Sequence, residues 1–172
     1  KFNVQGPLPA GIEILTFADF SKQNPAFISK WEKRNQILDQ NPMYDLNDAL
    51  TSSHQVIWVK EGTKLAKPIV HQLLADVSIA SAIQSKLLIY LEKDAQLTWV
   101  DDLCTHDSSE AILSNYVQEI WVEEAAQLTF IKTQDFALKT THIDHTYIYQ
   151  QAKSQVDMFT FSINGGFVRN NL

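Results

Sequence analysis

Cysteine is almost missing from this 172-residue chain, and Cys104 is the only one. No intrachain disulfide can form, which excludes a secreted disulfide scaffold and favours a reducing compartment. Apolar runs are short, and the longest, at residues 86–91, could not cross a bilayer. Residues 1–20 lack the order of a signal peptide. These absences predict a soluble cytoplasmic protein.

Basic residues are in the minority, with 14 Lys and Arg against 20 Asp and Glu and a net charge of -6. This balance disfavours nucleic acid and anionic membranes as partners. Glycine and proline are also sparse, at 5 each, while 45% of residues are hydrophobic, as in ordinary globular chains. We expect one main domain. The chain starts at Lys1 and stops in strand-like sequence at Leu172, so we expect a partial chain.

Residues 1–54 carry helix signals. The stretch Thr16-Phe17-Ala18-Asp19 has the form of a capping box and predicts a short helix that ends near residue 23. Asn24-Pro25 predicts a second start, with Asn as the cap and Pro at the first helical position. A third short helix is predicted at 45–50. Residues 1–54 are therefore predicted to form a helical N-terminal region.

From residue 55 onward, β-branched and aromatic residues alternate with polar ones in short runs. The predicted strands are 55–59, 68–74, 86–91, 95–101, 117–122, 126–133, 142–150 and 155–163.

These strands repeat. Residues 58–65, 90–97 and 121–128 align with one another at offsets of 32 and 31 residues, and a weaker copy at 149–156 follows 28 residues later. A β-rich repeat of this length indicates stacked units that bury their apolar faces on one another. Periodicity alone leaves a parallel β-helix and an antiparallel meander open, but the near-constant length of the units favours the β-helix.

The fold class is therefore predicted as mainly β, with a parallel β-helix over residues 55–172 that is truncated at its C-terminal end. An open last turn presents unpaired strand edges. We expect possible self-association through that edge.

Three groups of polar residues invite a chemical interpretation. Cys104 and His106 could bind a metal or handle a persulfide, but a structural site needs about four ligands and no second cysteine exists. A loop cysteine beside a solvated histidine, with a redox role left open, is the favoured interpretation. Strand alternation puts His142 and Asp144 on one face and His145 on the other, so the two histidines could not chelate a metal together, and the favoured interpretation is a surface His–Asp pair.

The acidic doublets Asp101-Asp102 and Glu123-Glu124, together with Trp58, Trp99 and Trp121, raise the alternative of a carbohydrate-active β-helix enzyme. It requires carboxylates from several turns to converge. Trp58 and Trp121 share one repeat position, which favours a packed ladder. His54 and His71 have no evident companion. We assign no catalytic, cofactor-binding or metal-ligating residue, and we expect no enzyme.

Several motifs, in a fixed order along the chain, carry a family resemblance. Residues 158–172, with Gly165-Gly166 and then Arg169-Asn170, resemble the signature of SufB and SufD proteins. This glycine pair is not a phosphate loop, and the sequence around it reads as a strand, a turn or bulge and a polar edge. Residues 57–69 and 113–122 resemble other family blocks, and residues 45–50 look more like SufD than SufB.

The resemblance implies a right-handed parallel β-helix behind a helical N-terminal region. It implies a non-catalytic scaffold subunit of the cytoplasmic SUF iron-sulfur cluster assembly complex, which pairs with a SufB-like protein. The full-length chain would bind the ATPase SufC. No cofactor is expected in these 172 residues, because the cluster would be assembled transiently by the full complex, with residues that lie mostly later in the chain.

Overall fold

The computed structural model describes residues 5–33, 41–52, 54–75, 79–105 and 110–172. Three helices and ten strands follow one another along this part of the chain: β1 (Ile12–Thr16), α1 (Phe17–Gln23), α2 (Pro25–Lys33), α3 (Pro42–Leu50), β2 (His54–Val59), β3 (Ile69–Ala75), β4 (Ser81–Leu91), β5 (Gln96–Thr105), β6 (Ile112–Val122), β7 (Gln127–Asp135), β8 (Thr140–Gln150), β9 (Gln155–Asn164) and β10 (Phe167–Asn171).

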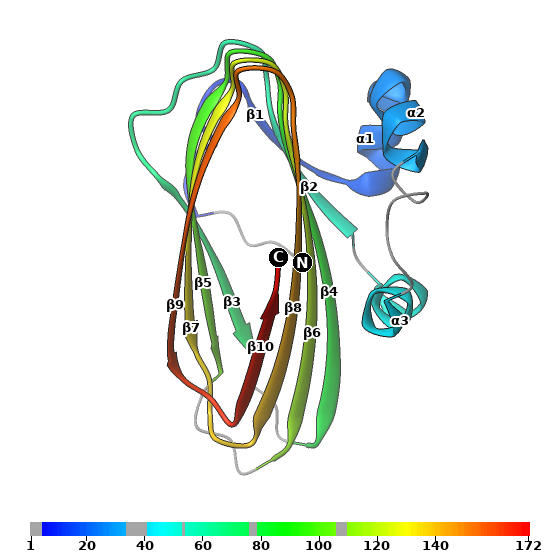
Figure 1. Cartoon of the computed structure of the whole chain (residues 1–172), viewed down its shortest axis with the longest axis vertical. Helices are drawn as coiled ribbons and strands as arrows, with labels where there is room; N and C mark the ends of the chain where they lie inside the picture. Colours follow the sequence, from blue (N-terminus) through cyan, green and yellow to red (C-terminus); the bar gives the residue numbers. More distant parts are fainter. Residues whose placement is uncertain (1–4, 34–40, 53, 76–78, 106–109) are drawn as a thin grey trace.

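The strands wind into a parallel β-solenoid (Figure 1). A six-stranded sheet has the order β1-β2-β4-β6-β8-β10, and a four-stranded sheet has the order β3-β5-β7-β9. Successive turns of the coil, here called rungs, each place one strand in each sheet. All neighbours pair in parallel except β1, which runs antiparallel to β2. The prediction of a parallel β-helix is confirmed, and the antiparallel meander is wrong.

The sequence repeat is the length of one rung. Trp58 pairs with Tyr90, and Tyr90 with Trp121, which are the residues aligned by the offsets of 32 and 31. Each predicted strand is present. β4 and β6 begin earlier than expected, at Ser81 and Ile112, because the neighbouring strand supplies hydrogen bonds even where the sequence is polar.

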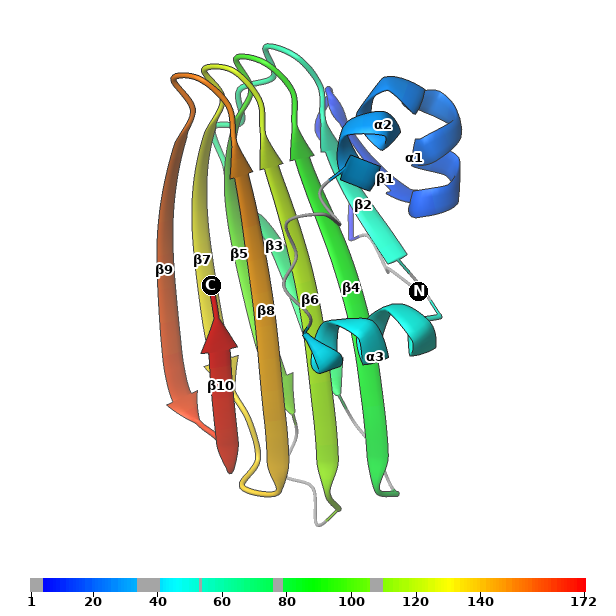
Figure 2. The same ribbon diagram turned by 45° about the vertical axis from the view of Figure 1, so that its right-hand side comes forward.

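Short turns join the two sheets at one end of the solenoid, here called the turn end, which is uppermost in Figure 2. Each of these turns has a residue with positive φ at the same place: Gly62, Asp94, Ala125 and Lys153. The turns also stack, since Asp94 N donates to Glu124 O at 3.0 Å and Ala125 N donates to Ala152 O at 3.1 Å. The opposite end, with the remaining connections, is called the loop end.

The N-terminal helices begin at the predicted caps. The Thr16 side chain accepts a hydrogen bond from Asp19 N at 3.2 Å, and Asn24 Oδ1 accepts one from Phe27 N at 3.2 Å. α3 begins at Pro42, earlier than predicted, because Asn41 caps it. The strand β1 was not predicted. It forms because the edge of β2 offers a ladder of backbone partners to the five residues before α1.

α1 and α2 cover the turn-end half of the six-stranded sheet, and α3 lies across β4 and β6 nearer the loop end (Figure 2). Beneath α1 and α2, an aromatic ladder runs up the sheet from Trp58 through Tyr90 to Trp121. Phe20 and Phe27 insert their rings against this ladder with centroids 4.5–5.8 Å from those of the ladder rings. The ladder expected from the repeat is therefore confirmed.

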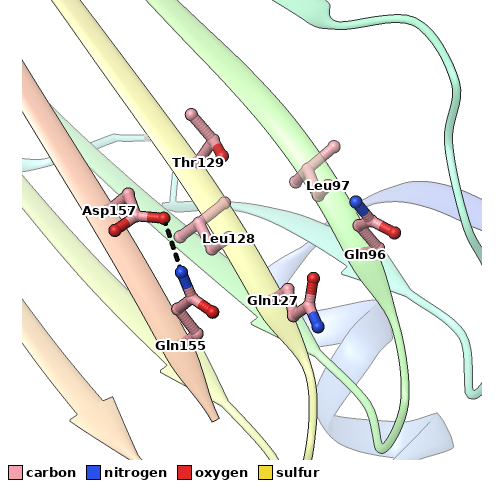
Figure 3. A pocket seen from close by; sticks show the side chains of 7 residues that line it. All are labelled: Gln96, Leu97, Gln127, Leu128, Thr129, Gln155 and Asp157. Carbon is pink, nitrogen blue, oxygen red and sulfur yellow. Dashed lines mark hydrogen bonds between the residues drawn. The ribbon is translucent and has the colours of Figure 1, made fainter.

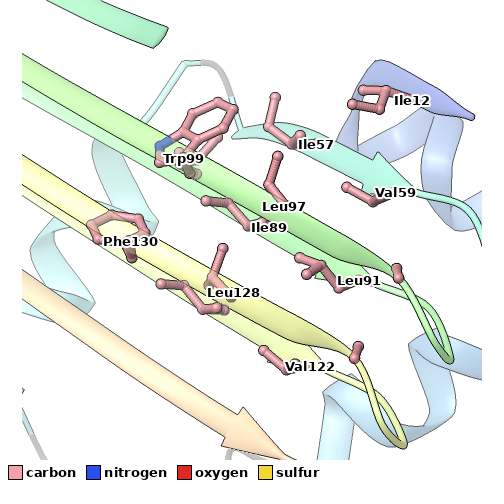
Figure 4. Packing of buried hydrophobic residues seen from close by; sticks show 14 of the residues in the cluster. Ile12, Ile57, Val59, Ile89, Leu91, Leu97, Trp99, Val122, Leu128 and Phe130 are labelled. Atoms are coloured by element: carbon pink, nitrogen blue, oxygen red, sulfur yellow. The ribbon is translucent and has the colours of Figure 1, made fainter. Parts of the chain in front are cut away.

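Between the two sheets, the turn-end half of the lumen is apolar (Figure 4). Leucine, isoleucine and valine from the six-stranded sheet meet Leu97, Trp99, Leu128 and Phe130 from the four-stranded sheet, and all are buried. Within the described residues, no helix is both long enough and apolar enough to cross a membrane.

Candidate functional site

The loop-end half of the lumen holds a cluster of polar and charged side chains. Strand alternation places them there, because Asp101 follows the inward Trp99 by two residues and Lys132 follows the inward Phe130 by two. Asp101 and Lys132 pair in register on neighbouring strands. The lumen cluster, as used below, comprises His71, Asp101, Ser114, Tyr116, Gln118, Lys132, His142, Asp144 and Thr146.

Its centre is an ion pair between Lys132 Nζ and Asp144 Oδ2 at 2.7 Å, and both side chains are 1% exposed. Lys132 Nζ also donates to Thr146 Oγ1 at 3.1 Å, and His142 Nε2 lies 3.6 Å from Asp144 Oδ2. Burial by itself raises the pKa of Asp144, but the Lys132 ammonium and the His142 ring bring it below its usual value. The cluster thus keeps the Asp144 carboxylate ionised inside the protein.

Asp101 forms a second centre. Its carboxylate lies 2.5 Å from His71 Nδ1 and accepts a hydrogen bond from Gln118 Nε2 at 2.6 Å. Gln118 Nε2 also lies 3.1 Å from the Tyr116 hydroxyl. Burial, and then the negative charges of Asp101 and Asp144, raise the pKa of Tyr116 well above its usual value. Tyr116 therefore stays a neutral phenol at any physiological pH.

The two centres are joined, because Thr146 Oγ1 lies 3.4 Å from Gln118 Oε1 and 2.9 Å from Asp144 Oδ1. Polar contacts therefore run from His71 on β3 to Lys132 on β7 and Asp144 on β8. Such a chain can fix the register of the rungs and hold buried charge. No group of three or more His, Cys, Asp or Glu side chains in the described residues could hold a metal ion.

A second polar group lies outside the lumen, between the six-stranded sheet and the helices. The buried Glu119 accepts hydrogen bonds from Tyr44 Oη at 3.0 Å and Trp31 Nε1 at 2.8 Å. Lys86 Nζ lies 3.7 Å from the Glu119 carboxylate and 2.5 Å from that of Asp48. These contacts tie α2 and α3 to the strands, so their role is attachment of the helices.

The interpretation of the segment with His142, Asp144 and His145 as a surface His–Asp pair is wrong. All three are buried, with His142 and Asp144 in the lumen and His145 on the outer side of β8. The prediction that the two histidines lie on opposite faces is confirmed. The surface interpretation failed because β7 of the other sheet meets the inner face of β8, and the start of α3 contacts its outer face.

His145 contacts the cap of α3. Asn41 Oδ1 accepts from Met43 N and Tyr44 N, so its Nδ2 faces His145 Nδ1, 2.9 Å away. The Nδ1 atom must then accept, which makes His145 a neutral ring with its proton on Nε2. Burial, opposed by Asp144 and assisted by Arg169, lowers the pKa of His145.

Cys104 lies on the outer side of β5, and His106 is outside the described residues. Burial raises the pKa of the Cys104 thiol, and the nearby carboxylates of Asp102 and Asp135 raise it further. A thiol with a raised pKa is a weaker nucleophile at neutral pH than a free one, so this position does not resemble an activated cysteine.

The four doublet carboxylates do not converge. Asp101 lies in the lumen, while Asp102 faces outward and accepts from Gln72 and Thr133 at 2.9 and 2.6 Å. Glu123 and Glu124 lie at the turn end and contact lysines at 3.0 and 3.3 Å: Lys30 and Lys93. Trp99 is inside the core. The arrangement required by a carbohydrate-active enzyme is absent from these residues. The statement that His71 has no companion is also wrong.

A small pocket lies where β5, β7 and β9 follow the turns (Figure 3). Stacked glutamines line it, one from each strand: Gln96, Gln127 and Gln155. Gln155 Nε2 donates to Asp157 Oδ2 at 2.9 Å. One carboxylate, three amides and one hydroxyl give this pocket no evident catalytic chemistry.

The Gly165-Gly166 motif closes the loop end of the last rung. A Cβ on Gly166 would lie 2.0 Å from the carbonyl oxygen of Leu138, so only glycine fits this close backbone approach. Beyond it, Asn170 exchanges two side-chain hydrogen bonds with Gln134, at 2.8 and 3.1 Å. The predicted turn after a strand is confirmed, and the residues after it form the strand β10.

Sequence reasoning missed the lumen cluster, although the signal was present. Every second residue of a strand faces the lumen. In β5 the inward residues Leu97 and Trp99 are followed at the same spacing by Asp101, and in β7 Leu128 and Phe130 are followed by Lys132. Continuing this alternation into the polar part of each strand would have predicted that Asp101 and Lys132 are buried.

Fold and site together define a parallel β-solenoid whose lumen is apolar at the turn end and charged at the loop end. A family model described as the SufBD core domain of SUF system FeS cluster assembly matches residues 74–172, which is more than half of the chain. The chain therefore belongs to the SufBD family.

Two curated relatives agree with this assignment. An iron-sulfur cluster assembly SufBD family protein from Synechocystis is 30% identical over 147 residues, covering 80% of this chain and 32% of the relative. The chloroplastic protein ABCI7 of Arabidopsis thaliana is 23% identical over 123 residues, covering 68% of this chain and 26% of the relative. The chain thus spans about a third or less of the length of these relatives.

Proposed function

We propose that the protein is a non-catalytic scaffold subunit of SUF iron-sulfur cluster assembly, of the SufD type. The observation that carries this proposal is the match of the SufBD core domain to residues 74–172, which includes most of the solenoid. The motif at the end of the chain contributes a structural turn at Gly166 and an amide pair at Asn170, and both serve to close a rung.

The chemistry of the lumen cluster supports a scaffold. Lys132 is paired with Asp144, and Asp101 with His71 and Gln118, so the charged groups already satisfy one another. A buried charge held by such partners contributes to the specificity of packing more readily than to catalysis. Burial and the carboxylates of Asp102 and Asp135 raise the pKa of Cys104, which disfavours its thiolate form at neutral pH.

Partners follow from the family. We propose that the solenoid associates with a SufB-like protein in the cytoplasm, and that a chain of the relatives' length recruits the ATPase SufC. The iron-sulfur cluster would be assembled by the whole complex, with no cluster resident in these 172 residues.

Anaerobic reconstitution with ferrous iron and sulfide tests the scaffold role. The 172-residue chain and its Cys104→Ser variant should give the same absorption spectrum after desalting, without a stable cluster. A stoichiometric cluster on the natural chain that disappears in Cys104→Ser would contradict the proposal.

Co-expression tests the partner. The chain carrying an affinity tag should co-purify with a SufB protein from the same organism. The variant Gly166→Ala tests whether the rung closed by this glycine contributes to the association. If it does, the variant should retain less SufB than the natural chain. If the natural chain is folded by circular dichroism and fails to retain SufB, the proposed pairing is wrong.

A further inference from the structure

The two broad faces of the solenoid are covered unequally. All three helices lie over the six-stranded sheet, and within the described residues no helix lies over β3, β5, β7 or β9 (Figure 1 and Figure 2). The central strands β5 and β7 have a neighbouring strand on each side, so their outward faces do not depend on where the chain begins or ends. In the described part of the chain, the outer face of the four-stranded sheet is therefore bare.

An apolar stripe crosses this bare face. Its four residues pair in register from strand to strand, and they point outward because they alternate with inward residues such as Trp99 and Phe130. The outer stripe, as used below, comprises Val70, Val100, Ile131 and Phe159. Val70 and Phe159 are 62% and 51% exposed, and the two central residues are half-buried. Contiguous apolar residues on a bare face are typical of an interaction surface.

Every charged residue that points outward from these four strands is an aspartate: Asp102, Asp135 and Asp157. Asp157 lies on the turn-end side of the outer stripe, and the other two lie on its loop-end side. They accept hydrogen bonds from neutral amides and a hydroxyl at 2.6–2.9 Å, and none forms an ion pair in the described ranges. Uncompensated negative charge thus flanks the outer stripe on both sides.

The covered face shows what kind of segment fits a surface of this type. There, the ring of Phe27 on α2 packs against Tyr90 and Trp121 of the aromatic ladder, with centroids 4.5 and 5.1 Å apart. Lys30 of the same helix places its Nζ 3.0 Å from Oε1 of Glu123, which lies beside the ladder. A helix with an apolar residue and a nearby lysine therefore covers a ladder with a flanking carboxylate.

The spacing of the rungs favours a helix over an extended segment on the bare face. Neighbouring strands lie about 4.8 Å apart, and one helical turn advances by about 5.4 Å. Successive turns of a helix laid along the axis of the coil can therefore contact successive residues of the outer stripe. Residues on one side of an extended strand are about 6.6 Å apart, which fits the rungs less well.

We propose that the outer face of the four-stranded sheet binds a basic amphipathic helix of a partner protein. The apolar residues of that helix cover the outer stripe, and its lysine or arginine residues pair with Asp102, Asp135 and Asp157. This assignment stands whether or not the proposed function holds.

A designed peptide of 18 residues is the probe, with leucines at i, i+4 and i+7 spacing and lysines elsewhere. The control peptide has glutamate in place of every lysine. Titration of the ¹⁵N-labelled chain with the lysine peptide should shift the amide resonances of β5 and β7 until they saturate. The dissociation constant should be at least tenfold lower than for the glutamate peptide. Raising NaCl from 50 to 500 mM should weaken binding at least threefold, because salt screens exposed charges.

Two variants test the contacts separately. Ile131→Lys places a cation in the outer stripe, and Asp102→Asn removes a carboxylate while keeping an acceptor for Gln72 and Thr133. Each should raise the dissociation constant of the lysine peptide at least threefold. Asp94→Asn makes the same change of charge at a turn and should have less than half the effect of Asp102→Asn. Circular dichroism checks each fold, and Asp102→Asn decides the test if Ile131→Lys does not fold.

Several outcomes would overturn the proposal. These are equal affinity for the two peptides, resonance shifts confined to the helix-covered face, and an effect of Asp94→Asn as large as that of Asp102→Asn. Analytical ultracentrifugation at the concentration of the titration covers a further outcome. If the chain self-associates and loses peptide binding as it does so, the outer stripe is covered by a second copy and the assigned occupant is wrong.

Discussion

The turn-end and loop-end halves of the solenoid are built on the same strands but stabilised differently. At the turn end, leucines and aromatic residues fill the lumen, and an aromatic ladder packs under α1 and α2. At the loop end, the lumen holds the Lys132–Asp144 pair, and α3 is attached by polar contacts such as that between Asn47 Nδ2 and Asn115 O at 2.9 Å.

The difference shows that a single repeat can be stabilised by apolar packing in one half and by paired buried charges in the other. Apolar packing in the turn-end half supplies a driving force that depends on buried area and volume. The loop-end half depends on matched partners, since each buried charge is tolerated only while its counterpart is present. Substitutions should therefore behave differently in the two halves.

The largest effect is expected from Lys132→Met, which leaves the Asp144 carboxylate buried without its cation. The free energy of unfolding, measured by urea denaturation, should fall by about 3–5 kcal/mol. The double variant Lys132→Met/Asp144→Leu should regain most of that loss, because both charges are gone. If single and double variants are equally unstable, the ion pair is not what the loop-end half depends on.

In the turn-end half, Leu128→Ala should lower the free energy of unfolding by about 2–5 kcal/mol, through lost transfer energy and a cavity. Leu128→Met, which conserves volume, should cost less than about 1.5 kcal/mol. Thermal denaturation followed by circular dichroism measures both. A Met variant as damaging as the Ala variant would contradict volume-dependent packing at this position.

Acid should act on the loop-end half through His145. Its pKa is lowered in the folded state from a usual value of 6.5, so its contribution to stability is present above about pH 6.5 and is lost as the pH falls through the folded-state value. Protonated Nδ1 can no longer accept from Asn41, and the cap of α3 weakens.

Urea denaturation at pH 7 and pH 5 tests this prediction. The natural chain should be less stable at pH 5, and His145→Gln, which retains an acceptor without titrating, should show a smaller difference between the two pH values. An unchanged difference in the variant would assign the acid sensitivity to other groups.

The smallest effect is expected at the turns. Ala125 has φ of 57°, a left-handed conformation that costs a non-glycine residue roughly 1–2 kcal/mol. Ala125→Gly should stabilise the protein by up to about 1 kcal/mol, after the entropic cost of glycine. Ala126→Gly, at the buried neighbouring residue, should destabilise it. Melting temperatures that fall for both variants would contradict the argument.

The sequence predicted the solenoid well because the same apolar positions recur in each rung, as Trp58, Tyr90 and Trp121 do. It did not predict β1, whose five residues become a strand only through the edge of β2. Strand formation that depends on a partner far away in sequence leaves little local signal.

The lumen cluster was missed for a different reason. Lys132 and Asp144 are residue types that normally face water, so Asp144 was interpreted as a surface residue and Lys132 attracted no interpretation. Their burial has two causes: the alternation that points both side chains into the lumen, and the distance between the two sheets. Together these place the Lys132 ammonium 2.7 Å from the Asp144 carboxylate. The first property can be read from sequence, but the second requires the three-dimensional structure.

The antiparallel strand β1 protects the first rung of the six-stranded sheet. In a linear array, each rung is stabilised mainly by its immediate neighbours, so opening begins where a neighbour is missing. β1 supplies a substitute neighbour to the six-stranded sheet at the first rung, and the helices hold the next ones. β2, paired with β1 on one side and with β4 on the other, should therefore keep slow amide exchange, and native-state hydrogen exchange would measure it.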